Sequence, residues 1–170
     1  MNDGKRYRIH NNYLTVGGGY LGSTLRKETQ KAVGLDFQFH IRTQKFQVGI
    51  LMSGNEFLSN NNLSGHVGYG LRKETSNYNF SLYGGLNYSY GVYAVADTGM
   101  TTQPKFYNDI GIYISAQVIK KITYDIGGGL ELYAEANQTH IMGGIKFIVF
   151  FSDSYRGVKR NYNPNVKTKK

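Results

Sequence analysis

The chain has 170 residues, enough for one domain with a real core, and it contains 22 glycines but only 2 prolines. It has no cysteine, which excludes disulfide scaffolds and metal sites built on thiolates. The formal net charge is +9, and the residues from Asp153 onward supply +5 of it. The charge therefore lies mainly in a basic tail, whose basic residues are Arg156, Lys159, Arg160, Lys167, Lys169 and Lys170.

No apolar run approaches the roughly 20 residues that a membrane-spanning helix needs. The first residues, Met1 to Arg6, are not followed by the apolar core of a secretory signal peptide. If the protein is exported, we expect this chain to be a mature form. We predict three parts: a polar lead-in at residues 1–11, a β-barrel at residues 12–151, and a flexible, basic tail at residues 152–170.

Residues 79–93 show the pattern from which we predict strands. Every second residue from Phe80 to Val92 is apolar, aromatic or glycine, and the residues between them are mainly polar or small. Successive side chains of a strand point to opposite faces, so a period of two separates the residues onto two faces. In chain order, the same alternation predicts eight strands at about residues 12–21, 32–42, 46–53, 63–72, 79–93, 109–118, 124–135 and 141–151.

The connections between the predicted strands alternate in length. Long ones follow the first, third and fifth strands, and short ones follow the second, fourth and sixth. The longest runs from Ala94 to Asn108 and contains Pro104, and the short connection after the seventh strand is an exception. Alternating connections are typical of an up-and-down barrel in an outer membrane, with long loops outside and tight turns toward the periplasm. An even number of strands leaves both termini on the periplasmic side.

Alternation alone does not say which face points inward. A soluble barrel such as a lipocalin has its apolar face inside, whereas a membrane barrel has it outside. Here the polar face is dense in glycine and tyrosine, which suits the crowded interior of eight strands. It also mixes charges of both signs, which a low-dielectric interior requires to be paired. The sequence therefore favours an all-β, eight-stranded antiparallel transmembrane barrel with an interior charge network of Asp36, His40, Arg42, Arg72, Asp109, Asp125, Glu131, Glu135 and Lys146.

Two segments carry a resemblance to known barrels. Residues 83–89, Tyr-Gly-Gly-Leu-Asn-Tyr-Ser, look like segments of Bacteroidota-type barrel proteins. Gly144, Phe147 and Val149 with the closing Phe150-Phe151 look like the final-strand signal that the barrel-assembly machinery reads. Over roughly residues 12–151 the chain thus resembles the small eight-stranded outer-membrane barrels of the OmpA/OmpX shape. The resemblance implies the outer membrane of a Gram-negative bacterium.

We considered catalytic and metal sites and predict none, with no cofactor. The four histidines, at positions 10, 40, 66 and 140, share no ligand spacing. The lipid A deacylase family has a His-x-Ser element on a strand, and no histidine here is followed in that way. Asp125, Glu131 and Glu135 could suggest acid–base work, but basic residues share their face, which favours static salt bridges.

The outward glycines Gly128, Gly143 and Gly18 fall on the seventh, eighth and first strands respectively, which are neighbours in a closed barrel. We predict that they form a shallow strip where a partner protein or ordered lipid lies close; the alternative is that they only relieve curvature. The expected function is a non-enzymatic structural or accessory subunit of a larger envelope assembly, of the secretion or outer-membrane biogenesis type. The alternatives are a lipocalin-like binder of a small ligand and a lipid-modifying enzyme. Expected partners are outer-membrane lipid and other envelope proteins, reached through the strip and the tail, and not nucleic acid.

Overall fold

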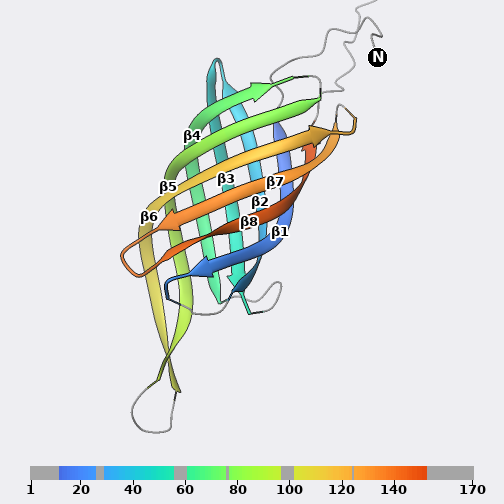
Figure 1. Cartoon of the computed structure of the whole chain (residues 1–170). Helices are drawn as coiled ribbons and strands as arrows, with labels where there is room; N and C mark the ends of the chain where they lie inside the picture. The colour runs from blue at the N-terminus through green and yellow to red at the C-terminus, as the bar shows by residue number, and fades with distance from the viewer. Residues whose placement is uncertain are drawn as a thin grey trace, which may run out of the picture.

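Eight antiparallel strands form a closed barrel (Figure 1). Each strand is hydrogen-bonded to the strands that precede and follow it in the sequence. The computed structural model describes residues 12–25, 29–55, 61–75, 77–96, 102–123 and 125–152. The predicted lead-in and the tail from residue 153 onward lie outside these residues. The predicted fold class and all eight strands are confirmed. The strands are β1 (Tyr13–Ser23), β2 (Gln30–Ile41), β3 (Gln44–Gly54), β4 (Asn62–Glu74), β5 (Tyr78–Ala96), β6 (Thr102–Lys121), β7 (Ile126–Ala136) and β8 (Ile141–Ser152).

The barrel closes where β8 pairs with β1, with Tyr13 opposite Ser152. The first strand therefore begins where the last one ends. We call this the terminal end, and it also carries the connections at residues 42–43, 75–77 and 122–125. The opposite end, the loop end, carries the connections at residues 24–29, 55–61, 97–101 and 137–140. Among the residues described, no helix is long and apolar enough to cross a membrane.

The apolar face of the wall points outward and the polar face points into the lumen. On β2, Leu35 and Phe37 are 40% and 42% exposed, whereas Asp36 and Gln38 are 2% and 0% exposed. The other strands alternate in the same way along their length. This arrangement is the reverse of a lipocalin, so the soluble alternative is wrong. An outer surface of this kind is stable in hydrocarbon, and the chain is a transmembrane barrel.

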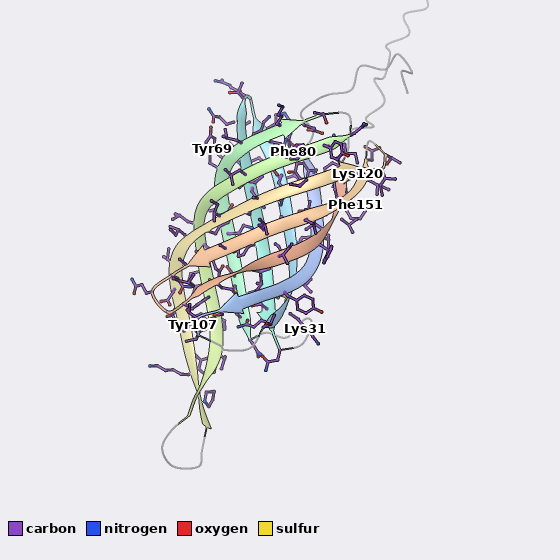
Figure 2. The ribbon with its side chains drawn as sticks, viewed as in Figure 1. Lys31, Tyr69, Phe80, Tyr107, Lys120 and Phe151 are labelled. Atoms are coloured by element: carbon purple, nitrogen blue, oxygen red, sulfur yellow. The ribbon has the colours of Figure 1, made fainter. Side chains whose placement is uncertain are left out.

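Aromatic side chains form a belt on the outer face near the terminal end. The rings of Phe37, Phe39, Phe46 and Tyr69 follow one another across β2, β3 and β4, with centroids 5.5 to 5.8 Å apart. Figure 2 shows Tyr69, Phe80 and Phe151 near this end, and Lys31 and Tyr107 near the loop end. Outer-membrane barrels carry such aromatic girdles where hydrocarbon meets the head groups. The belt thus marks the membrane boundary at the terminal end.

The inward glycines allow the wall to close tightly around the lumen. A Cβ on Gly19 would lie 2.0 Å from the carbonyl oxygen of Ile145, and one on Gly129 would lie 2.1 Å from that of Val118. Outward glycines have room: nothing lies within 4 Å of a Cβ built on Gly65. A side chain at the inward positions would push neighbouring strands apart. Small residues are therefore a packing requirement of the interior.

Strands β5 and β6 are longer than the rest and continue past the barrel rim as a two-stranded ribbon (Figure 1). Their pairing extends to Ala96 opposite Thr102. Strand β4 follows β5 only as far as Gly91, and β7 reaches β6 only from Ile112. The expectation of a long loop from Ala94 to Asn108 is therefore wrong, because most of that segment is strand.

Candidate functional site

Four inward side chains from four strands meet in the middle of the lumen. Lys146 Nζ on β8 lies 3.0 Å from Glu131 Oε2 on β7 and 3.5 Å from Asp36 Oδ2 on β2. His66 Nε2 on β4 lies 2.7 Å from Asp36 Oδ1. All four are buried. One lysine therefore bridges two carboxylates, and a histidine holds the free oxygen of one of them.

Aromatic rings surround this central cluster and fill the space beside it. Lys146 Nζ lies 5.0 Å from the ring centroid of Tyr133, in the geometry of a cation–π contact. The ring of Tyr113 lies 4.5 Å from that of His66 and stacks on that of Tyr133 at 6.1 Å. Both tyrosines are buried. The charges and rings together close the lumen across its middle.

The carboxylate of Glu135, nearer the loop end, is held by a dense set of donors. The hydroxyls of Tyr133 and Ser64 each donate to Oε2 at 2.7 Å, and Ser89 donates to Oε1 at 3.1 Å. Asn87 donates to Oε2 at 3.1 Å, and His140 Nε2 lies 3.2 Å from Oε1. A carboxylate with all its lone pairs occupied is fixed in place. Its role is to tie β4, β5, β7 and the β7–β8 connection together.

A second charged cluster lies near the terminal end. Glu74, at the end of β4, forms ion pairs with Lys121 and, at 3.7 Å, with Arg72 Nη2. The guanidinium of Arg72 also lies 5.1 Å from the ring centroid of Tyr13, and Lys121 Nζ lies 5.8 Å from that of Phe150. This cluster closes the lumen at the end where the chain enters and leaves the barrel.

The structure brings some of the predicted network together and leaves other members apart. Asp36, Glu131 and Lys146 meet in the centre, while Glu135 and Arg72 belong to the two clusters on either side of it. Asp109 lies near the loop end, where Thr139 Oγ1 donates to its Oδ2. His40 is half-buried near the end of β2, opposite Lys45 of β3.

Two of the predicted interior residues lie outside the strands. Arg42 is exposed in the turn between β2 and β3, and its φ of 56° is the left-handed conformation that a tight two-residue turn requires. Asp125 lies in the connection before β7, where its carbonyl accepts a hydrogen bond from the amide of Ser152. The interior placement is wrong for Arg42, whose strand ends one residue earlier, whereas Asp125 is half-buried just before β7 and its place in the network stays a prediction.

Sequence reasoning also missed residues that belong to these clusters. Glu74 and Lys121 were assigned to turns, although β4 and β6 continue through them. His66 and His140 are not among the residues predicted for the interior network, yet both are buried beside a carboxylate. The signal for Glu74 and Lys121 was available, because each keeps the inward parity of its strand.

The clusters place carboxylates beside cations and hydroxyl donors inside the lumen. Lys146 faces both Asp36 and Glu131, and Glu135 accepts hydrogen bonds from several hydroxyls. Within the described ranges, no group of three or more His, Cys, Asp or Glu side chains could hold a metal ion. The arrangement stabilises the barrel, because buried charges are tolerated only when they are paired.

The outward glycines do not form the predicted strip. Gly18 lies opposite Phe147, and Gly128 lies opposite Val149, so exposed side chains of β8 separate the positions. Gly143 instead belongs to a different feature, an apolar groove of about 550 Å³ on the outer face. Gly143 and Ala134, which are cross-strand partners, line this groove together with Ala116. The strip is therefore replaced by a groove with small side chains at its floor.

No protein-family model and no curated protein matches the sequence significantly. Solved structures do match. Neisserial surface protein A has a TM-score of 0.60 at 12% identity, with 86% of this chain and 99% of that one covered. The N-terminal β-barrel domain of Pseudomonas aeruginosa OprF has a TM-score of 0.58 at 9% identity, and the match covers 85% of this chain and 100% of that domain. Ail, the attachment invasion locus protein of Yersinia pestis, has a TM-score of 0.57 at 6% identity, and the match covers 85% of this chain and 99% of that one. The chain thus has the fold of the small eight-stranded outer-membrane β-barrels, whereas the Bacteroidota-type likeness stays a prediction.

Proposed function

We propose that this chain is a non-enzymatic accessory subunit of an envelope assembly, held in the outer membrane by its barrel. The terminal end, with its short turns, faces the periplasm, and the loop end faces outward, as is usual for such barrels. The barrel is a rigid anchor in this proposal, and the parts that extend past it make the contacts. The observation that carries the proposal is the β5–β6 ribbon with its unpaired edges.

The filled lumen argues against transport and against catalysis. Lys146, Tyr133 and Glu131 are buried in the middle of the barrel, where they occupy the lumen that a solute would have to cross. Lys146 is shared between Asp36 and Glu131, and this pairing of buried charges supports a structural role. Eight-stranded barrels commonly have interiors that side chains fill. A structural role fits this interior better than a pore or an active site.

Within the part of the chain that the structure describes, the ribbon offers two strand edges that no other strand covers. The amide of Val92 still bonds to the carbonyl of Asn61, but residues 93–96 of β5 pair only with β6, and β7 pairs with β6 only from Ile112 onward. Unpaired edges are templates for an added strand. Pro104 removes one amide donor from the β6 side, so the β5 edge at residues 93–96 is the better template. The expected partner is an extended segment of another envelope protein that adds to this edge.

The basic tail is a second contact in this proposal. It lies outside the described residues, and it follows β8 at the terminal end of the barrel. From the periplasmic side its cations can meet an acidic protein surface or anionic head groups. Removing residues 153–170 is expected to weaken recovery of the partner and to leave the heat-modifiable gel mobility of the barrel unchanged.

Site-specific photo-cross-linking in native membranes tests the proposal. A photoreactive amino acid at position 105 on the ribbon is expected to give a defined cross-linked product with one envelope protein. The same group at position 71, exposed on the lipid face near the terminal end, is the control and is expected not to give that product. Equal products at both positions, or none at position 105, would contradict the accessory role. A change in lipid A mass on overexpression would instead support the enzymatic alternative.

A further inference from the structure

The groove on the outer face crosses four strand boundaries, from β5 to β1. Its lining is almost entirely apolar, and it is open on one side. Ala116, Ala134 and Gly143 form its floor because they have little or no side chain, while Leu82, Leu132 and Ile145 stand beside them. All six belong to the outward face of their strands. The groove is therefore a hollow in the surface that meets hydrocarbon.

Strand register shows the direction in which the groove runs. Leu82 pairs with Ala116, Ala116 with Leu132, and Leu132 with Ile145. The row continues from Ile145 to Tyr20 on β1, which also lines the groove. Leu82 lies near the terminal end of β5, and Tyr20 lies near the loop end of β1. The groove thus crosses the wall obliquely, from near the terminal end on β5 to near the loop end on β1.

A lysine and a tyrosine stand where the groove reaches the loop end. Tyr20 pairs across the sheet with Lys31, the second residue of β2. Both side chains are on the outward face, and Figure 2 places Lys31 near the loop end of the barrel. Tyrosine and lysine side chains are favoured at the level of the lipid head groups, because the apolar part lies in hydrocarbon and the polar tip reaches water. The groove therefore has an apolar length and a cationic end.

We propose that this groove seats one acyl chain of an anionic, phosphate-bearing lipid in the leaflet at the loop end. The chain lies along the row from Tyr20 toward Leu82, over the floor of Ala116, Ala134 and Gly143. The phosphate lies against the ammonium of Lys31, and the Tyr20 hydroxyl is at the same level. The order of features along the groove matches that of such a lipid. The cationic end lies at the membrane interface, and the apolar part of the groove extends into the membrane.

The size of the groove favours a lipid chain over a partner's transmembrane helix. A helix is about 10–12 Å across, so two of its turns would fill roughly 850 Å³ or more. The groove holds about 550 Å³. The groove is thus smaller than two turns of a helix, and its volume is closer to what a single acyl chain fills.

Photo-labelling with lipids tests this inference. Purified barrel is placed in phosphatidylcholine vesicles that contain either a phosphatidylglycerol or a phosphatidylcholine with a diazirine on one acyl chain. After illumination, labelled peptides are located by mass spectrometry. We expect labelling from the phosphatidylglycerol probe to concentrate on β7 and β8 around Ala134 and Gly143. Labelling spread evenly around the barrel would overturn the proposal.

Two pairs of variants make the test specific. Gly143→Leu fills the floor, and it is expected to reduce labelling of β7 and β8 several-fold. Gly65→Leu adds the same side chain on the outward face of β4, where there is open space, and is expected to have no effect. Lys31→Gln is expected to lower the preference for phosphatidylglycerol about fivefold, the factor that corresponds to about 1 kcal/mol for one lysine at the membrane surface. Lys120→Gln, at the terminal end, is its control.

The outcome is independent of the accessory role, because the ribbon and the groove are different surfaces. If Gly143→Leu leaves the labelling of β7 and β8 unchanged, the groove does not seat the chain. If Gly143→Leu lowers the labelling but both lipids respond equally to Lys31→Gln, the lysine does not select the anionic head group. Recovery from native membranes of a protein cross-linked at position 134 would show that a partner occupies the groove, and would also overturn the lipid assignment.

Discussion

Glycines of this chain differ in function according to the face of the wall on which they lie. Adjacent residues in β5 show the difference. A Cβ on Gly85 would lie 2.1 Å from the carbonyl oxygen of Val67, whereas the nearest atom to a Cβ on Gly84 is the Tyr113 carbonyl oxygen at 3.5 Å. The first distance requires a shift of the neighbouring backbone, and the second is ordinary contact.

Alanine substitutions at these two positions form a matched pair. Gly85→Ala is expected to lower the free energy of unfolding by about 1–3 kcal/mol, the range for overpacking in a tight interior. Gly84→Ala is expected to change it by less than about 0.5 kcal/mol. Urea titration in lipid vesicles, followed by heat-modifiable gel mobility, measures both. Equal effects from the two variants would show that the space inside the wall is not the limiting factor.

Lys146 is the charge on which the central cluster depends. Lys146→Met leaves Asp36 and Glu131 facing each other without their shared cation, and removal of one partner from a buried pair costs about 3–5 kcal/mol. The same urea titration is expected to show a loss of that size. Lys105→Met removes an exposed lysine of the ribbon and is the control. Adding Glu131→Gln to Lys146→Met is expected to recover part of the loss; no recovery would mean that carboxylate repulsion is not its cause.

Strict alternation was sufficient to assign most inward residues, and it failed where strands meet turns. Asp36, Glu131 and Lys146 lie well inside their strands, so parity alone places them in the lumen. Arg42 continues the same parity, but β2 has already ended at Ile41 and the side chain is exposed in the turn. The partners of the central charges could not be predicted, because which inward residues meet depends on strand stagger around the closed barrel.

At the scale of elements, the ribbon shows that the alternation of apolar and polar residues depends on the membrane around the strand. Inside the membrane one face of every strand must be apolar, and this requirement produces the alternation that predicts strands. Residues 102–109 read Thr-Gln-Pro-Lys-Phe-Tyr-Asn-Asp and have no apolar face. They are nevertheless paired with β5 up to residue 96. Beyond the rim both faces meet water, so a strand there carries no periodic signal, and alternation alone predicts a loop.

The barrel is expected to fold without the ribbon, because among the described strands only β5 and β6 pair with each other there. Replacing residues 94–104 by Asn-Gly keeps Tyr93 and Lys105 as a cross-strand pair and supplies a two-residue hairpin turn. The unfolding free energy in vesicles is expected to stay within about 0.5 kcal/mol of the parent chain. A large loss would show that the ribbon is part of the fold. In native membranes, the same variant is expected to lose the partner that position 105 reaches.

At the scale of the whole molecule, the distribution of polarity follows from what surrounds the barrel. Leu71, Ile110 and Phe147 are 70%, 70% and 67% exposed, which would be very unfavourable in water but is favourable in hydrocarbon. The lumen, in turn, holds buried charges that only close pairing can stabilise. A barrel with wide water in its lumen would not need this pairing. The interior is therefore built to be closed, and its charges are part of the packing.

A closed interior leads to a direct expectation for permeability. Vesicles that contain the purified barrel are expected to exclude small sugars in a swelling assay, because Tyr113, Tyr133 and the Lys146 cluster block the middle of the lumen. A porin with 16 to 18 strands, whose lumen is an aqueous channel, is the positive control. Tyr133→Ala removes one ring of this plug, yet Lys146 and its two carboxylates still cross the lumen, so the variant is also expected to exclude sugars. Swelling of vesicles with the parent barrel would contradict a closed lumen, and with it the argument against transport.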